Sequence, residues 1–259
     1  MQEAGKEVVV KESPDEERAQ KALARSSFYG ILSRGFAYPT EEVLGEIKAG
    51  AVSSELKGSA AYLEEEGLLQ SVGALCEAME GEIAPFGLRD VEGGYNRIFS
   101  MGLLCPHHET FYTSAHVFMK SQDLADIQGF YNAFGFNLAE EQKELADFIG
   151  TELEFMYVLC FKEYHALKKG EKDKADLCRE AQAKFVEGHI GVWAGAFALT
   201  LSVSSHMDYF TTLGRLLEKF VDFDCQYLGV TPKKVSAPEE GWKREAEPLS
   251  CGEDIQGLK

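Results

Sequence analysis

Apolar residues recur at steps of three and four along most of the chain, which is the spacing of one face of an α-helix. The first such run begins near Glu17, and its apolar positions are Ala22, Phe28, Tyr29, Leu32 and Phe36. Pro39 ends this helix, because the residue before a proline is driven out of the α region. A short second helix is predicted from Thr40 to the neighbourhood of Gly50.

The same spacing predicts further helices over residues 56–80, 88–99, 114–134, 145–167, 172–186, 189–203 and 209–228. Gly67 and the pair Gly93-Gly94 are weak points inside two of them, since a glycine costs roughly 1 kcal/mol there relative to alanine. Gly135 is expected to end its helix as a C-cap. Residues 100–113 show no periodicity and contain glycine and proline, so they are predicted to form a long loop.

No run of residues is typical of a β-strand, and Val8-Val9-Val10 is too short and isolated to count. The chain is therefore predicted to be all-α, a single globular multi-helix domain of about eight or nine helices over residues 17–230. Residues 1–16 are charged and aperiodic and are expected to be a mobile N-terminal arm. Residues 231–259 are rich in proline, glycine and charge and are expected to be a disordered C-terminal tail.

The stretch from Gly188 to Met207 contains no Asp, Glu, Lys or Arg. Only about 14 of its residues are uninterruptedly apolar or small, whereas a membrane span needs about 20. A helix buried in a protein core is therefore predicted, with Trp193 and Phe197 inside it and no stable membrane insertion. The aromatic run from Phe130 to Phe136 is either a binding platform or a helix end packed into the core, and the periodicity favours the core.

Composition narrows the possible partners and compartment. The 26 Lys and Arg against 43 Asp and Glu give a net charge of −17, which repels phosphate backbones and excludes nucleic acid as an expected partner, while it favours basic ones. The N-terminal segment has no apolar core of signal-peptide length, and the six cysteines include no Cys-x-x-Cys pair. Reduced thiols in a cytoplasmic protein are the expectation.

No motif for chemistry is complete. None of the histidines has a glutamate three residues before it, and His108-Glu109 lacks the second histidine of a zinc-protease helix. Cys105, His107, His108 and Glu109 could each bind zinc, but neighbours this close rarely reach one ion in tetrahedral geometry. Nucleophile elbows and phosphate loops are also missing. We expect no catalytic residue, no metal site and no cofactor.

Several segments in the same order resemble the TorD/DmsD family of redox-enzyme maturation chaperones. The resemblance is carried by residues 25–32, 36–39, 94–99, 105–112, 125–136, 147–156 and the His189-Ile-Gly-Val-Trp193 stretch with Phe197. The most specific piece is Asp147-Phe-Ile-Gly-Thr-Glu-Leu-Glu-Phe-Met156. The sequence departs from the family at Phe148, where the family commonly has histidine after the aspartate.

The resemblance implies an all-helical chaperone that binds the twin-arginine signal peptide of a molybdenum-containing oxidoreductase and assists cofactor insertion before export. Its partners would be this signal peptide and the folding catalytic subunit, and it would act as a monomer or homodimer. The Cys-Pro-x-x-Glu loop is most similar to chaperones of dimethylsulfide, ethylbenzene and selenate-type enzymes.

A receptor for such a peptide needs an apolar groove with carboxylates at one end. Arginine would pair with Glu109, Asp126 or Asp147, and Phe111, Tyr112 and Phe148 would line the apolar part. Glu152, next to Glu154 on an otherwise apolar helix, is expected to be solvated or to face the groove. The expected peptide-binding residues are Cys105, Pro106, Glu109, Phe111, Tyr112, Asp126, Asp147, Phe148 and Glu152.

Two other classes of function stay open on the sequence alone. One is a small helical enzyme that binds a metal or a nucleotide, which metal analysis of the purified protein would test. The other is a structural subunit of an oxidoreductase complex, which would co-purify with the mature enzyme. A chaperone would bind only the immature form.

Overall fold

The computed structural model describes residues 13–101, 104–114, 117–138 and 145–237. Within these residues the chain has eleven α-helices, one π-helical turn and no strand, which confirms the all-α class. The helix count exceeds the predicted eight or nine. Residues 1–12 and 238–259, where the arm and most of the tail were predicted, lie outside the described residues.

The helices follow one another along the chain in a fixed order. They are α1 (Pro14–Phe36), α2 (Glu41–Lys48), α3 (Ala51–Leu63), α4 (Glu66–Ile83), α5 (Leu88–Tyr95), the π-helical turn η1 (Asn96–Met101), α6 (Thr110–Thr113), α7 (Val117–Ala133), α8 (Ile149–Lys168), α9 (Lys172–Gly188), α10 (Ile190–Ser204) and α11 (Asp208–Leu228).

The extra helices come from breaks that the apolar spacing hides. The helix predicted over 56–80 is two helices, because Glu64 adopts a left-handed conformation with φ 57° and ends α3. Glu65 then caps α4 by accepting hydrogen bonds from Gly67 N and Leu68 N, so Gly67 lies in the first turn of α4 and not in the middle of a longer helix. The predicted long loop over residues 100–113 likewise contains the short helix α6.

Helix boundaries shift where local capping decides them. Ser13 accepts a hydrogen bond from Glu16 N and Pro14 is the first helical residue, so α1 begins inside the predicted arm. At the other end, Gly229 ends α11 with φ 72°, and the chain continues packed beyond the predicted boundary at 230. Val235 N donates to Val192 O at 3.0 Å, which holds this segment against α10. Gly135, with φ 65° after α7, is the expected left-handed glycine.

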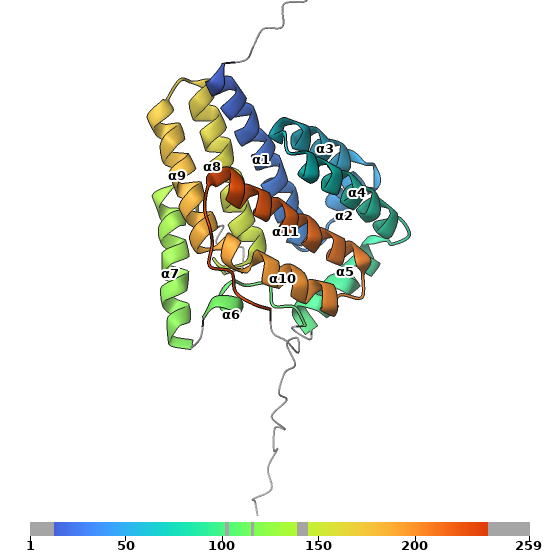
Figure 1. Cartoon of the computed structure of the whole chain (residues 1–259). Helices are drawn as coiled ribbons and strands as arrows, with labels where there is room; N and C mark the ends of the chain where they lie inside the picture. Colours follow the sequence, from blue (N-terminus) through green and yellow to red (C-terminus); the bar gives the residue numbers. More distant parts are fainter. Residues whose placement is uncertain (1–12, 102–103, 115–116, 139–144, 238–259) are drawn as a thin grey trace, which may run out of the picture.

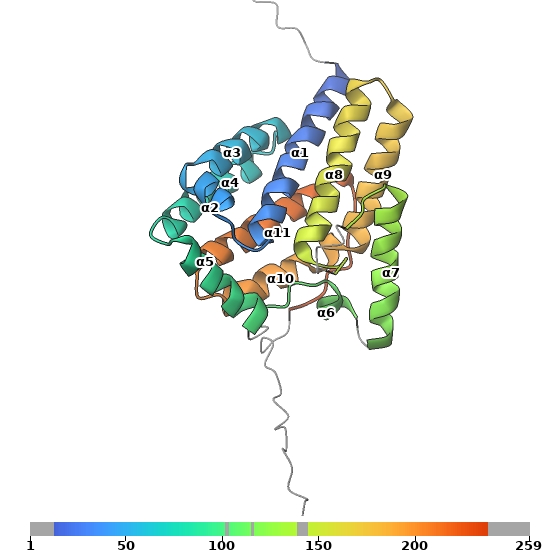
Figure 2. The same ribbon diagram turned by 180° about the vertical axis from the view of Figure 1, so that it is seen from behind.

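Helices α1 and α8 lie side by side at the centre of the fold (Figures 1 and 2). Helices α2, α3 and α4 lie on one side of this pair, α9 and α7 lie on the other, and α11 crosses one face above α10. The predicted core positions of α1, from Phe28 to Phe36, are buried. Trp193 and Phe197 of α10 are fully buried as predicted.

No single helix in the described part of the chain is long and apolar enough to cross a membrane. Helices α9 and α10 meet the length and composition criteria only when taken together, and they are bent by 47° relative to each other.

Charged side chains also join the central helices. Arg25 of α1 is fully buried, and its Nε and Nη2 donate to the carboxylate of Asp224 on α11. Tyr29 OH donates to the same carboxylate at 2.7 Å, and Arg25 Nη1 donates to Gln182 Oε1 on α9 at 2.6 Å. Burial alone lowers the pKa of Arg25, but the charge of Asp224 outweighs it and holds that pKa well above its usual range.

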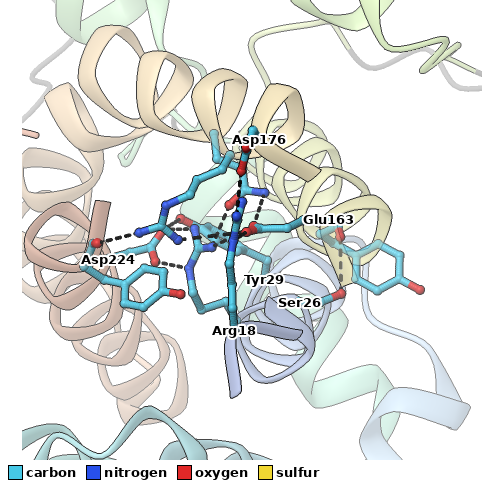
Figure 3. Close-up of polar contacts among 11 residues, drawn as sticks. Arg18, Ser26, Tyr29, Glu163, Asp176 and Asp224 are labelled. Carbon is cyan, nitrogen blue, oxygen red and sulfur yellow. Dashed lines mark hydrogen bonds and ion pairs between the residues drawn. The ribbon is translucent and has the colours of Figure 1, made fainter. Parts of the chain in front are cut away.

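The network extends to the second carboxylate, Glu163 of α8, which is also fully buried. It accepts hydrogen bonds from Arg18 Nε at 2.8 Å and from Gln182 Nε2 at 2.9 Å. Figure 3 shows these contacts, with Arg18, Glu163 and Asp224 among the labelled residues. The guanidinium groups of Arg18 and Arg25 on α1 thus pair with the carboxylates of Glu163 on α8 and Asp224 on α11, and Gln182 of α9 bridges Arg25 and Glu163.

Candidate functional site

The two segments that carry the most specific motifs lie against each other. His108 and Phe148 form an isolated antiparallel bridge, in which Glu109 N donates to Asp147 O and Ile149 N donates to His107 O, both at 2.9 Å. This bridge ties the loop before α6 to the first turn of α8. Residues almost 40 positions apart in the sequence are therefore neighbours.

Asp147 is fully buried and its carboxylate is satisfied from within the protein. It accepts hydrogen bonds from Thr110 Oγ1 at 2.6 Å, from Thr110 N at 3.2 Å and from His108 Nδ1 at 3.1 Å. Burial by itself raises the pKa of Asp147, but the hydrogen bonds from His108 and Thr110 outweigh it and lower that pKa. Asp147 is therefore a charged anchor of the loop, and its charge does not face solvent.

Glu109 and Glu152 are two further buried acidic residues near Asp147. Both oxygens of Glu109 lie 3.2 Å from His189 Nδ1, and Glu152 Oε2 accepts a hydrogen bond from Trp193 Nε1 at 3.1 Å. Burial raises the pKa of Glu152 well above its usual range, and the negative charge of Glu109 and a hydrogen bond to it add to this effect. This shift favours the neutral form of Glu152, and because the side chain is fully buried the expectation that it is solvated is wrong.

The remaining residues of the predicted Cys-Pro loop pack beneath α10. Tyr112 OH donates to Pro106 O at 2.8 Å, and the Tyr112 ring lies 5.3 Å from that of Trp193. Burial raises the pKa of the Cys105 thiol to about 12, so this cysteine is protonated at neutral pH and is a poor nucleophile. In the described part of the chain no three His, Cys, Asp or Glu side chains are grouped so as to hold a metal ion.

Phe148, the departure from the family pattern, is buried among histidines. Its ring centroid lies 5.2 Å from that of His107 and 5.9 Å from that of His108. Gly150 makes room for this ring, because a Cβ there would lie 2.5 Å from Phe148 Cε1. Burial, followed by the charge of His108, lowers the pKa of His107 to about 4. The imidazole of His107 is therefore neutral at physiological pH.

Asp126 of α7 is the predicted carboxylate that reaches solvent, with 71% of its side chain exposed. Its Oδ2 lies 3.4 Å from His189 Nε2, and the other nitrogen of that ring contacts Glu109. Phe111 is half-buried and its ring is covered by Lys120 Nζ at 4.2 Å. Tyr112 is also half-buried, whereas the other six predicted residues are buried: Cys105, Pro106, Glu109, Asp147, Phe148 and Glu152.

A groove of about 360 Å³ runs from Asp126 between α7 and α9, and we call it the α7–α9 groove. Its apolar lining includes Phe130, Phe134, Leu177 and Ala181, and its charged lining residues are Asp126, Glu180 and Lys184. Sequence reasoning considered the aromatic run on α7 but did not identify the side chains of α9. The sequence does indicate the α7 side of this groove, because Asp126, Phe130 and Phe134 are spaced four residues apart and so share one helix face.

Comparisons with known proteins bear on the role of this site. Residues 64–199 match the family model described as nitrate reductase delta subunit. The chain is 27% identical over 213 residues to the perchlorate reductase assembly chaperone protein of Dechloromonas aromatica (strain RCB), covering 80% of this chain and 90% of that protein.

Shorter matches concern two further curated proteins. The selenate reductase assembly chaperone protein of Thauera selenatis is 33% identical over 97 residues, and the chlorate reductase assembly chaperone protein of Ideonella dechloratans is 32% identical over 97 residues. Each of these matches covers 37% of this chain and 49% of the relative. A solved structure of a proposed redox enzyme maturation protein from Archaeoglobus fulgidus aligns with a TM-score of 0.42 at 16% identity, over 84% of this chain and 99% of that one.

The curated relatives are named as assembly chaperones and not as enzymes, in agreement with the expectation that this protein is not an enzyme. The family model covers more than half of the 259 residues. The motifs that resemble TorD and DmsD fall largely in the same region. The chain therefore belongs to the nitrate reductase delta subunit family, which comprises TorD-like chaperones of redox-enzyme maturation.

Proposed function

We propose that this protein is a cytoplasmic chaperone that binds the twin-arginine signal peptide of a molybdenum-containing oxidoreductase. It holds the folding catalytic subunit, as a monomer or homodimer, while the cofactor is inserted and before export. The observation that carries this proposal is the similarity to the perchlorate reductase assembly chaperone, which extends over 90% of that relative.

Charge and surface chemistry support a basic, partly apolar ligand. The net charge of −17 attracts basic segments over long range. At close range, the exposed carboxylate of Asp126 stands at one end of a groove with an apolar lining. A twin-arginine signal has its charges and its apolar stretch in adjacent segments, and this surface offers a complementary pair.

The predicted site residues take two different roles in this proposal. Glu109, Asp147 and Glu152 are buried and hydrogen-bonded within the protein, so they shape the loop before α6 and the start of α8. Asp126 and the half-buried Phe111 are placed where a peptide can touch them. Recognition therefore relies on the exposed part of the predicted set, and the buried part keeps that surface in shape.

Isothermal titration calorimetry tests the proposal. The titrant is a synthetic twin-arginine signal peptide, and the control is the same peptide with both arginines changed to glutamine. We expect the native peptide to bind and the control to bind more weakly. No binding, or equal binding of the two peptides, contradicts arginine recognition. Stable co-purification with the mature reductase would instead indicate a permanent subunit.

A further inference from the structure

The α7–α9 groove is open because α7 is held to the fold by only one of its faces. Ile127 and Tyr131 are fully buried, and Tyr131 OH donates to Ala146 O at 2.7 Å. Phe130 and Phe134 lie at the side of this face, are half-buried and turn toward α9 as lining of the groove. The opposite wall is Leu177, of which 57% is exposed.

The size of the groove suits a few side chains of a bound segment. Its volume of about 360 Å³ is at the lower end of the range of about 300–1,000 Å³ that is typical of ligand pockets. Gly129 and Ala133 of α7 and Ala181 of α9 have little or no side chain, so the groove is open to solvent. Phe130 continues into the core, where its ring lies 5.4 Å from that of Phe185. This anchoring makes the apolar wall a preformed one.

Charge is distributed unequally along the groove. Glu180 and Lys184 of α9 both line the groove, and they form an ion pair 2.7 Å apart in which the two charges offset each other. Asp126 of α7 lies toward the C-terminal end of α9, where its Oδ2 is 3.4 Å from His189 Nε2, and it has 71% of its side chain in solvent. One carboxylate oxygen of Asp126 thus remains for a planar guanidinium, which pairs well with a carboxylate.

We propose that the α7–α9 groove binds the apolar stretch of the signal peptide while Asp126 pairs with one of its arginines. This inference rests on the proposed function and gives it a place on the molecule. A negative charge at the end of an apolar groove matches a segment in which basic residues precede apolar ones. A second copy of this chain fits less well, because each copy carries a net charge of −17 and the two would repel each other.

Fluorescence anisotropy with the full-length protein tests the assignment. The probe is a labelled synthetic peptide with two adjacent arginines followed by about 12 apolar residues, within the range of about 7–15 for the apolar region of signal peptides. Leu177→Ser should weaken binding about tenfold, since it removes apolar area that the peptide would cover. Leu199→Ser on α10 is the matched control, because Leu199 is 56% exposed and lies outside the groove.

The arginine contact has its own pair of variants. Asp126→Asn should weaken binding by up to about fivefold, the range of an exposed ion pair. It should cause no further loss with a probe whose arginines are glutamines, since coupled partners are not additive. The control is Glu77→Gln on α4, whose side chain is 74% exposed.

The outcomes separate the two proposals. If the wild-type protein does not bind the probe, the proposed function and this inference fail together. If the wild type binds and Leu177→Ser binds equally well, the groove is not the site, although signal-peptide binding stands. A loss with Leu199→Ser alone would move the site to α10. A change in sedimentation of Leu177→Ser, without a change in peptide binding, would make the groove an interface between copies and overturn the inference.

Discussion

The buried pair of Arg25 and Asp224 provides the sharpest test of how this fold is held together. We consider the change Arg25→Met, which keeps a long side chain and removes the charge. Asp224 would lose both hydrogen bonds from the guanidinium and keep the one from Tyr29 OH at 2.7 Å. Glu163 would keep Arg18 at 2.8 Å, so the damage is concentrated on Asp224.

The magnitude follows from what is left behind. Removing one partner of a buried ion pair costs about 3–5 kcal/mol, because the remaining charge is desolvated without compensation. We expect Arg25→Met to lower the free energy of unfolding by this amount. Asp224→Asn should cost less, because Arg25 retains Gln182 at 2.6 Å and lies 3.8 Å from Glu163. Replacing both partners, as Arg25→Met with Asp224→Asn, should cost less than the sum of the two single changes.

Urea unfolding near neutral pH, followed by far-ultraviolet circular dichroism, measures these differences directly. The exposed pair of Lys57 and Glu77 gives the control, since Glu77→Gln should change stability by less than about 1 kcal/mol. The reasoning fails if Arg25→Met costs no more than this control. It also fails if the double variant is as unstable as the two single losses added together, because the stranded charge would then not be the cause.

Two further predictions concern groups whose pKa values are shifted in opposite directions. The pKa of His107 is lowered and that of Glu152 is raised, and both shifts favour the neutral form. The pKa of His107 is lowered from 6.5 to about 4, so the unfolded chain takes up a proton in this window that the folded protein refuses. Stability is therefore lost as the pH falls from 6.5 to 4, by roughly 3 kcal/mol, and His107→Gln should show a shallower loss in urea unfolding across the same range. The pKa of Glu152 is raised, so stability is lost as the pH rises above its ordinary value of 4.5. Glu152→Gln, which can still accept from Trp193 Nε1, should gain stability relative to the wild type between acid and neutral pH, and a constant difference would contradict the assignment.

The sequence predicts those elements of the fold that depend on a strong local pattern. The first long helix and the uncharged helix around Trp193 and Phe197 are identified by spacing and composition. The break at Glu64 is not, because a glutamate in a left-handed conformation carries no turn signal comparable to a glycine. The π-helical turn after Tyr95 is also missed, because it continues the helical spacing of apolar residues without interruption.

The candidate site shows a different limit. Two of the segments that carry the motifs meet in space, where His108 and Phe148 form a bridge. Residue type does not say which carboxylate faces solvent. Asp126 and Asp147 look alike in the sequence, but one is largely exposed and the other accepts three hydrogen bonds inside the protein. That distinction depends on contacts across the fold, which no local pattern encodes.

The buried carboxylates position the loop before α6 and, through it, the surface near Asp126. Glu109 contacts His189, and His189 contacts Asp126 through its other nitrogen. The loop that carries Glu109 is in turn fixed to α8 by Asp147. Each of these residues is needed to place the next, so a change at Glu109 or Asp147 alters the surface near Asp126 without touching a ligand. Binding defects of variants at the two buried carboxylates would therefore accompany losses of stability, whereas defects at Asp126 would not.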